Sequence, residues 1–168
     1  MSWLWGPMSP YGAWAAIITL ALDQASKWWV LAGYGLQDRG RVRVSPFLDL
    51  VYVRNLGISY GLLPLDSRLG QWLLAGFAVL ASLALAVWLA RGIGSRVVAV
   101  SVGLIVGGAV GNAIDRVVLG GVADFIQLHA FGFYWYVFNI ADAAIVAGVG
   151  GLLYDSLGLS RNRAAKSL

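Results

Sequence analysis

Two aspartates in the C-terminal third of the chain are the residues best suited to chemistry. Asp142 lies within the almost entirely apolar stretch YVFNIADAAIVAGVGGLL (136–153), and Asp124 lies just upstream in GGVADFIQL. A lone ionised carboxylate in so apolar a segment is costly, so we expect Asp142 to be neutral or paired. Two carboxyl groups held close together share a proton, and such a pair can activate a water molecule without a metal or a thiol.

Each aspartate also has a plainer interpretation. Asp142 could form a buried ion pair with Arg116 or Lys27, and Asp124 could be a solvated acid in a short outer connection. The pair interpretation needs Asp124 to fold back over the end of the helix that carries Asp142, and the short connection between them allows this.

The side-chain inventory excludes most metal and redox chemistry. The 168 residues include one histidine and no cysteine, whereas zinc, haem and iron–sulfur sites need several imidazole or thiolate ligands. We therefore expect no metal and no cofactor, and interpret His129 as a loop residue. Nucleic acid is not an expected partner, because the two basic clusters fit a loop on an anionic surface and a solvated tail. These clusters are Arg39, Arg41 and Arg43, and Arg161, Arg163 and Lys166.

The composition points to a membrane protein. Hydrophobic residues make up 60% of the chain and charged residues 12%, which is about half the charged fraction of a soluble domain. Apolar windows long enough to cross a bilayer predict four transmembrane helices in a single domain, residues 1–168. The predicted spans are about 13–33, 69–90, 97–119 and 134–157.

The connection at 34–68 is predicted to contain a small β subdomain. Its stretch GRVRVSPFLDLVYVRN (40–55) alternates polar and apolar residues as a half-buried strand does. Arginines and lysines divide evenly between the two sides, so their count does not decide the orientation. Because a folded segment is translocated largely regardless of charge, we discount this connection and place both termini in the cytoplasm. The fold class is then an all-α integral membrane protein of four helices with a small β-containing outer subdomain between helices 1 and 2.

Polar residues of three predicted helices fall at one depth. At about 1.5 Å of rise per residue, all of them reach the outer leaflet: Asp23, Lys27, Asn112, Asp115, Arg116, Asn139 and Asp142. Asp23 and Lys27 are spaced for a structural ion pair. Arg116 could snorkel to the interface, or it could clamp a carboxylate or a lipid headgroup. Gly107 and Gly111 have the spacing that lets two helices approach closely.

Two other classes of function fit a small membrane protein with buried charges. A proton-coupled transporter or channel subunit would use Asp23, Lys27 and Asp142 as relay groups. Such a relay should spread polar groups across the full depth, whereas the inner halves of the spans are nearly free of charge. An assembly protein would only pair its acids, and Asp→Asn changes would then alter stability rather than a reaction.

Four blocks of the chain together resemble the prolipoprotein (type II) signal peptidases, the bacterial lipoprotein signal peptidase family. They are DQASKWWV (23–30), VRNLGISYGLL (53–63), GGAVGNAIDRVVLGGVADFI (107–126) and FNIADAAI (138–145). The resemblance implies a multi-pass, inner-membrane aspartyl endopeptidase with its active site facing the periplasm. Its substrates would be prolipoproteins, cut immediately before the diacylglyceryl-modified cysteine, and globomycin-type peptides would inhibit it. Membrane lipids would be further partners.

The resemblance also assigns roles to individual residues. Asp124 and Asp142 correspond to the two catalytic aspartates. Positions that support the pair or bind substrate would be Asp23, Lys27, Asn55, Gly108, Asn112, Arg116, Asn139 and Ala141. The chain departs from the family pattern at Ile58–Ser59–Tyr60, where Ala-Ala-Phe is common, and at Ala123, where a bulkier aliphatic residue is commoner. These departures leave the aspartate pair intact and concern the shape of the lid and lipid groove.

Overall fold

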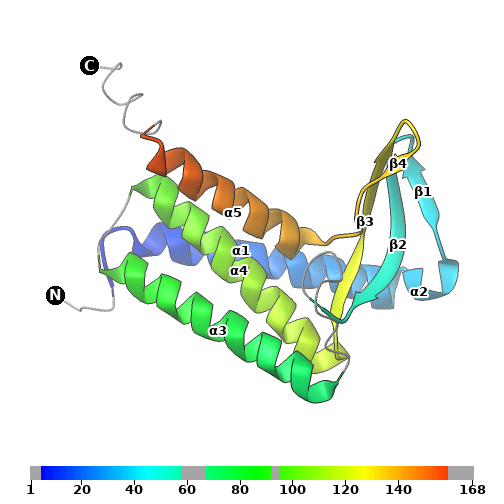
Figure 1. Cartoon of the computed structure of the whole chain (residues 1–168), viewed down its shortest axis with the longest axis horizontal. Coiled ribbons are helices and arrows are strands. Elements are labelled where there is room, and N and C mark those ends of the chain that lie inside the picture. The colour runs from blue at the N-terminus through cyan, green and yellow to red at the C-terminus, as the bar shows by residue number, and fades with distance from the viewer. Residues whose placement is uncertain (1–4, 58–66, 92–94, 159–168) are drawn as a thin grey trace.

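Four long helices lie side by side, and a small sheet stands across one end of the bundle (Figure 1). The computed structural model describes residues 5–57, 67–91 and 95–158. The helices are α1 (Ser9–Trp28), α3 (Arg68–Ala90), α4 (Arg96–Leu119) and α5 (Ile140–Ser156). A π-helical turn, η1 (Trp29–Gly33), continues α1, and a short helix, α2 (Leu36–Arg39), follows it.

Local signals explain where the helices begin and end. Ser67 Oγ accepts a hydrogen bond from the backbone N of Gly70 at the start of α3, and Ser95 Oγ accepts one from Val98 at the start of α4. Both serines therefore satisfy a backbone donor that the first turn leaves free. Gly120 ends α4 with a φ of 71°, a left-handed conformation that glycine adopts without a steric penalty.

Helix α4 forms the centre of the bundle, between α3 and α5 and in front of α1 in Figure 1. Its glycines permit close packing, as predicted for Gly107: a Cβ there would come within 2.5 Å of the Ala16 carbonyl oxygen of α1. A Cβ at Gly111 would collide with the carboxylate of Asp23. The small-residue spacing therefore brings α1 against α4 at the level where the buried charges lie.

The outward faces of the helices are apolar, as expected for a surface in contact with lipid. Helix α3 exposes large hydrophobic side chains along its length, among them Leu69, Phe77 and Leu80. Within the described ranges, α3 and α4 are long and apolar enough to cross a membrane by length and composition. Helix α1 contains two charged residues and α5 has 17 residues, so the four-span count stays a prediction.

The sheet combines strands from two separate connections. It has the antiparallel order β1-β2-β3-β4, formed by β1 (Val42–Ser45), β2 (Leu48–Asn55), β3 (Val122–Ala130) and β4 (Phe133–Tyr134). The predicted strand character of residues 40–55 is confirmed. Strands β3 and β4, however, come from the connection between α4 and α5, which was expected to be a short loop.

Strand β3 changes two expectations about this connection. The last helix begins at Ile140 rather than near residue 134, because Phe133–Tyr134 form β4 against β3 and Phe138 forms a bridge with Ile126. His129 lies in β3, not in a loop, with its Nε2 3.1 Å from Oδ1 of buried Asp49. Arg41 and Arg43 also pair with Asp49, at 3.2 and 3.6 Å. These two arginines therefore neutralise a buried acid of the sheet.

Candidate active site

Asp124 and Asp142 come from different elements that meet at the sheet end of the bundle. Asp124 lies in β3, opposite Val53 of β2, and is only 1% exposed. Asp142 is the third residue of α5 and is half-buried. The loop position expected for Asp124 is therefore wrong: the regular pairing of two strands fixes its backbone.

Asn139 connects the two aspartates. Its Nδ2 donates to Oδ1 of Asp124 at 2.7 Å, while its Oδ1 accepts a hydrogen bond from the backbone N of Asp142 at 2.9 Å. Oδ2 of Asp142 in turn accepts a hydrogen bond from the backbone N of Asn139 at 3.3 Å, which completes a capping box. Asn139 is thus the N-cap of α5 rather than a residue inside the helix, and it binds the Asp124 carboxyl group through its side chain and that of Asp142 through its backbone N.

Two further asparagines complete this network from neighbouring elements. Asn112 of α4 donates from Nδ2 to Oδ1 of Asp142 at 2.9 Å, and its Oδ1 accepts a hydrogen bond from Nδ2 of Asn139 at 3.2 Å. Asn55 of β2 donates from Nδ2 to Oδ2 of Asp124 at 3.1 Å. Nζ of Lys27 donates to Oδ1 of Asn112 at 3.0 Å. The structure therefore places four predicted supporting residues around Asp124 and Asp142: Lys27, Asn55, Asn112 and Asn139.

Neutral amides, not cations, hold the two aspartates. The described residues provide no ion pair for Asp124 or Asp142. The alternative in which Asp142 pairs with Arg116 or Lys27 is therefore wrong for this structure. Carboxyl groups without a neutralising partner can change protonation state more easily than paired ones, which suits proton transfer.

Burial gives Asp124 an unusual affinity for protons. Removal of its carboxyl group from water, and next the nearby charge of Asp142, raise the pKa of Asp124 to about 7. Hydrogen bonds from Asn55 and Asn139, and the charge of Lys27, act in the opposite direction. At neutral pH, Asp124 can therefore hold a proton or release it with little change in free energy.

The raised pKa of Asp124 predicts a pH dependence of stability. The folded protein binds this proton up to about pH 7, whereas the unfolded chain releases it near pH 4. The contribution of this bound proton to the stability of the folded protein is therefore fully present below about pH 4 and is lost as the pH rises through about 7. An Asp124→Asn variant has no buried charge to accommodate, so it should gain melting temperature relative to the natural protein when the pH is raised from about 5.5 to 8.5. Melting curves at both pH values test this, and an unchanged difference would contradict it.

A second buried cluster lies beside the aspartate pair. Nζ of Lys27 is 2.8 Å from Oδ2 of Asp23 and 2.8 Å from Oδ2 of Asp115, so one cation lies between two acids. The predicted pair of Asp23 and Lys27 is thus confirmed. The sequence places Asp115 at the same depth but does not indicate its role, and no sequence signal indicates Gln24, whose Nε2 donates to both acids at 3.2 and 3.1 Å.

This charged cluster holds the backbone next to each candidate catalytic residue. Oδ1 of Asp23 accepts a hydrogen bond from the backbone N of Ala141 at 3.0 Å, and Oδ2 of Asp115 accepts one from Ala123 at 3.1 Å. Ala141 precedes Asp142, and Ala123 precedes Asp124. Both alanines are fully buried, so a larger side chain at either position would have to displace its neighbours.

Arg116 forms no ion pair with a carboxylate of the described residues, and its position suggested that contact as one alternative. Its Nη1 donates to the carbonyl oxygen of Asn112 at 3.2 Å, and its Nη2 donates to that of Gly57 at 3.1 Å. Its Nε is buried without a partner among the described residues. The departure at Ile58–Ser59–Tyr60 lies outside the described residues.

Gly108 sets the distance between the two helices that carry the network. A Cβ at this position would lie 2.6 Å from the Ala141 carbonyl oxygen and 2.9 Å from Cγ1 of Ile145. We predict that Gly108→Ala pushes α5 away from α4, destabilises the protein by about 1–3 kcal/mol and reduces activity. Gly76→Ala on α3 is the matched control, because a Cβ there meets nothing within 4 Å. The melting temperature of Gly108→Ala should therefore fall, whereas that of Gly76→Ala should not.

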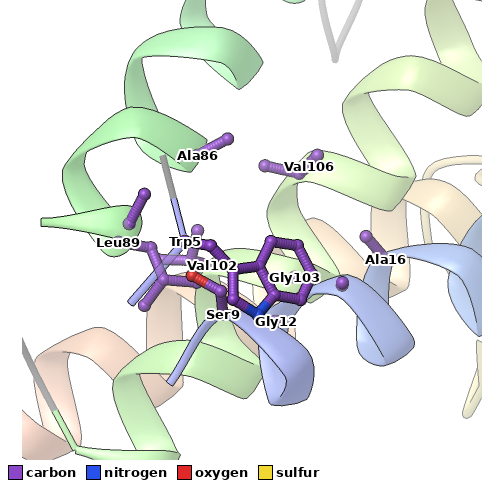
Figure 2. A pocket seen from close by; sticks show the side chains of 11 residues that line it. Trp5, Ser9, Gly12, Ala16, Ala86, Leu89, Val102, Gly103 and Val106 are labelled. Carbon is purple, nitrogen blue, oxygen red and sulfur yellow. The ribbon is translucent and has the colours of Figure 1, made fainter. Parts of the chain in front are cut away.

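The cavity at the opposite end of the bundle has no comparable chemistry. It holds about 150 Å³ and lies between the start of α1, the end of α3 and the start of α4. Figure 2 shows its apolar walls, with Trp5, Leu89 and Val102 around the small residues Gly12 and Gly103. Apart from the indole N–H of Trp5, Ser9 carries the only polar group among the described lining side chains. The cluster at the sheet end is therefore the candidate active site.

Comparisons with known proteins cover most of the chain. A family model described as "Signal peptidase (SPase) II" matches residues 15–158. A lipoprotein signal peptidase from Methylobacterium sp. (strain 4-46) is 56% identical over 142 residues, which cover 84% of this chain and 86% of that protein. One from Beijerinckia indica subsp. indica is 49% identical over 151 residues, covering 89% of this chain and 90% of that protein.

Solved structures show the same fold. One, described as a bacterial membrane enzyme determined by the in meso method at 2.3 Å resolution, has a TM-score of 0.72 and is 27% identical, with 90% of each chain covered. A second, at 1.9 Å resolution, has a TM-score of 0.71 and is 28% identical, covering 87% of this chain and 92% of that one. These neighbours and the family relatives are consistent with an integral membrane protein.

Proposed function

Because this chain belongs to the signal peptidase II family, we propose that it is an aspartyl endopeptidase that removes the signal peptide from prolipoproteins. It cuts the amide bond immediately before the diacylglyceryl-modified cysteine. Asp124 and Asp142 activate the water molecule that attacks this bond. The chain needs no metal or cofactor for this reaction, because the two carboxyl groups supply both the base and the acid.

The observation that carries the proposal is the position of Asn139. Its side chain donates to Asp124 and caps the helix turn that bears Asp142. Since Asn139 hydrogen-bonds both carboxyl groups, one through its side chain and one through its backbone N, we infer that the two groups act on a single water molecule. The raised pKa of Asp124 supports the same role, since one member of such a pair must hold a proton at neutral pH.

In the proposed reaction the ionised carboxylate removes a proton from water while the water oxygen attacks the scissile carbonyl carbon. The protonated carboxyl group donates its proton to the carbonyl oxygen, which becomes a hydroxyl group of the tetrahedral intermediate. The carbon–nitrogen bond then breaks, and the nitrogen receives the proton first taken from water. Collapse of the hydroxyl group to a carbonyl returns the other proton, so the pair is restored.

The amide network keeps this geometry fixed during the reaction. Asn112, Asn139 and Asn55 donate to carboxylate oxygens from α4, the start of α5 and β2. Each aspartate keeps an oriented set of donors whether or not it holds the proton. Such preorganisation avoids the reorientation that water would need around the changing charge.

We further propose that the protein spans the inner membrane four times, with both termini in the cytoplasm and the active site facing the periplasm. The start of α1 and the end of α5 lie at the same end of the bundle, opposite the sheet (Figure 1). Apolar side chains cover the sides of the bundle between these ends. A substrate anchored by its lipid would therefore approach the aspartates from the outer leaflet.

Purified protein incubated with a diacylglyceryl-modified precursor tests this function. The precursor should be cut once, immediately before the modified cysteine, as read by the mass of both products. The same precursor without its lipid should be cut much more slowly, and a globomycin-type peptide should block the reaction. Folded protein that leaves the lipidated precursor intact would contradict the proposal.

A further inference from the structure

A hollow of about 380 Å³ lies beside the candidate active site, where β2 ends, α3 begins and α4 ends. Its described lining includes three arginines, Arg54, Arg68 and Arg116, and no carboxylate. These residues come from three different elements. The fold therefore gathers positive charge at one point of the sheet end, and none of the proposed catalytic steps uses Arg54 or Arg68.

None of the three arginines is neutralised by a described residue. The structure records no ion pair between any of them and a carboxylate in the described ranges. Arg116 donates to two backbone carbonyl oxygens, and its buried Nε has no partner in that part of the chain. Guanidinium groups that form no ion pair with a carboxylate can bind an oxyanion, to which arginine donates two parallel hydrogen bonds.

An apolar groove of about 550 Å³ continues from this hollow between α3 and α4. Val117 and Val118 line both spaces. The groove runs along α3 from Trp72 to Leu80, a rise of about 12 Å, which approaches the thickness of one leaflet of the hydrocarbon core. A charged hollow joined to an apolar groove of this length matches a molecule with an anionic head and an acyl chain.

We propose that this site binds an anionic phospholipid of the outer leaflet, distinct from the lipid of the substrate. Its phosphate lies among Arg54, Arg68 and Arg116, and one acyl chain lies along the groove between α3 and α4. The diacylglyceryl group of a prolipoprotein has no charge, so it does not account for three arginines that form no ion pair with a described residue. Since Arg116 also donates to the carbonyl oxygen of Asn112, the bound lipid holds one edge of the aspartate network.

Trp72 provides a direct reporter of this site, because its indole lines the groove and is half exposed. Three probes with brominated acyl chains are added separately to purified protein: phosphatidylglycerol, phosphatidylcholine and diacylglycerol. Bromine quenches tryptophan fluorescence on contact, and the part due to Trp72 is the difference between the natural protein and Trp72→Phe. We expect phosphatidylglycerol to quench Trp72 at a much lower concentration than either of the other two probes.

The double variant Arg54→Gln/Arg68→Gln tests the origin of this preference. Both arginines are exposed, and each should contribute several-fold to the binding of an anionic lipid. The preference for phosphatidylglycerol over phosphatidylcholine should therefore fall by on the order of tenfold. Arg91→Gln/Arg96→Gln is the matched control: it removes the same charge from exposed positions at the other end of the bundle and should leave the preference intact.

The possible results separate the alternatives. Equal quenching by phosphatidylglycerol and phosphatidylcholine in the natural protein would show ordinary contact with bulk lipid and overturn the proposal, whatever the variants do. Diacylglycerol binding as tightly as phosphatidylglycerol would assign the groove to the substrate and also overturn it. A preference that falls equally in both double variants would show an effect of net charge alone and overturn it as well. The binding measurement needs no cleavage, so its failure leaves the proposed peptidase function untouched.

Discussion

Asp124→Asn and Asp142→Asn should each lower the rate of prolipoprotein cleavage by on the order of 10³-fold, while the variants still insert and fold. An asparagine cannot take a proton from water or donate an acidic one, so either change removes one half of the pair. The shape of the side chain is kept, and with it most of the hydrogen bonds. The measurement is single-turnover cleavage of a diacylglyceryl-modified precursor by purified enzyme.

The two substitutions have a similar, small cost in the asparagine network. Both oxygens of Asp124 accept amide donors, from Asn55 and Asn139. An amide group at position 124 must therefore turn an N–H towards one of these donors, which removes a hydrogen bond. At Asp142 the donors are Asn112 and the backbone N of Asn139, and the same conflict arises there. Loss of one hydrogen bond is worth about 1 kcal/mol, which is small beside the expected loss of rate.

Asp38→Asn is the matched control for both variants. Asp38 is exposed in the short helix α2, so the same change of charge should leave cleavage within a factor of about two. Near-normal cleavage by Asp124→Asn or Asp142→Asn, in membranes from which any background enzyme has been removed, would refute the catalytic pair. A large fall in melting temperature without a specific loss of rate would favour a purely structural role for the acids.

Local signals in the sequence were sufficient for several features of this protein. The i,i+4 spacing of Asp23 and Lys27 predicted their ion pair, and the alternation of residues 40–55 predicted strands in that segment. The spacing of Asn139 and Asp142 also indicates where the last helix begins. An asparagine followed three residues later by an acid is a helix-start signal, and it places the start of α5 at Ile140.

Other features depend on partners far away in the sequence. VADFIQLHA forms β3 because it pairs with β2, about 70 residues earlier in the chain, where Val53 lies opposite Asp124. The sequence of the segment itself does not indicate this partner. Asp115 likewise acquires its role only when α1 and α4 pack together and bring Lys27 to its carboxylate. Such long-range pairings are set by tertiary structure, whereas single-sequence patterns report on neighbouring residues.

Lys27→Met should be the most destabilising single substitution in the site. Lys27 is 3% exposed and lies between Asp23 and Asp115, both buried. Removal of the cation leaves two buried carboxylates close together without compensation, which costs about 3–5 kcal/mol. The melting temperature in detergent should therefore fall by roughly 10 °C. Arg91→Met is the control: it removes an equal charge at an exposed position, so it should change the melting temperature by little.

Lys27 also acts as a positioning residue, and kinetics can separate this role from stability. The two acids that it holds accept hydrogen bonds from the backbones of Ala141 and Ala123, the residues before Asp142 and Asp124. At temperatures well below its melting point, Lys27→Met should therefore lower kcat while KM changes little, since the carboxyl groups shift relative to the bond that is cut.

Adding Asp115→Asn to Lys27→Met should restore part of the lost stability, because only one uncompensated carboxylate then remains. The amide oxygen that this change introduces at position 115 can still accept the hydrogen bond from the backbone N of Ala123. Melting temperatures of the single and double variants measure this coupling. If the double variant is less stable than Lys27→Met alone, the acids are not held in place by the lysine charge, and the cluster cannot be what aligns the aspartates.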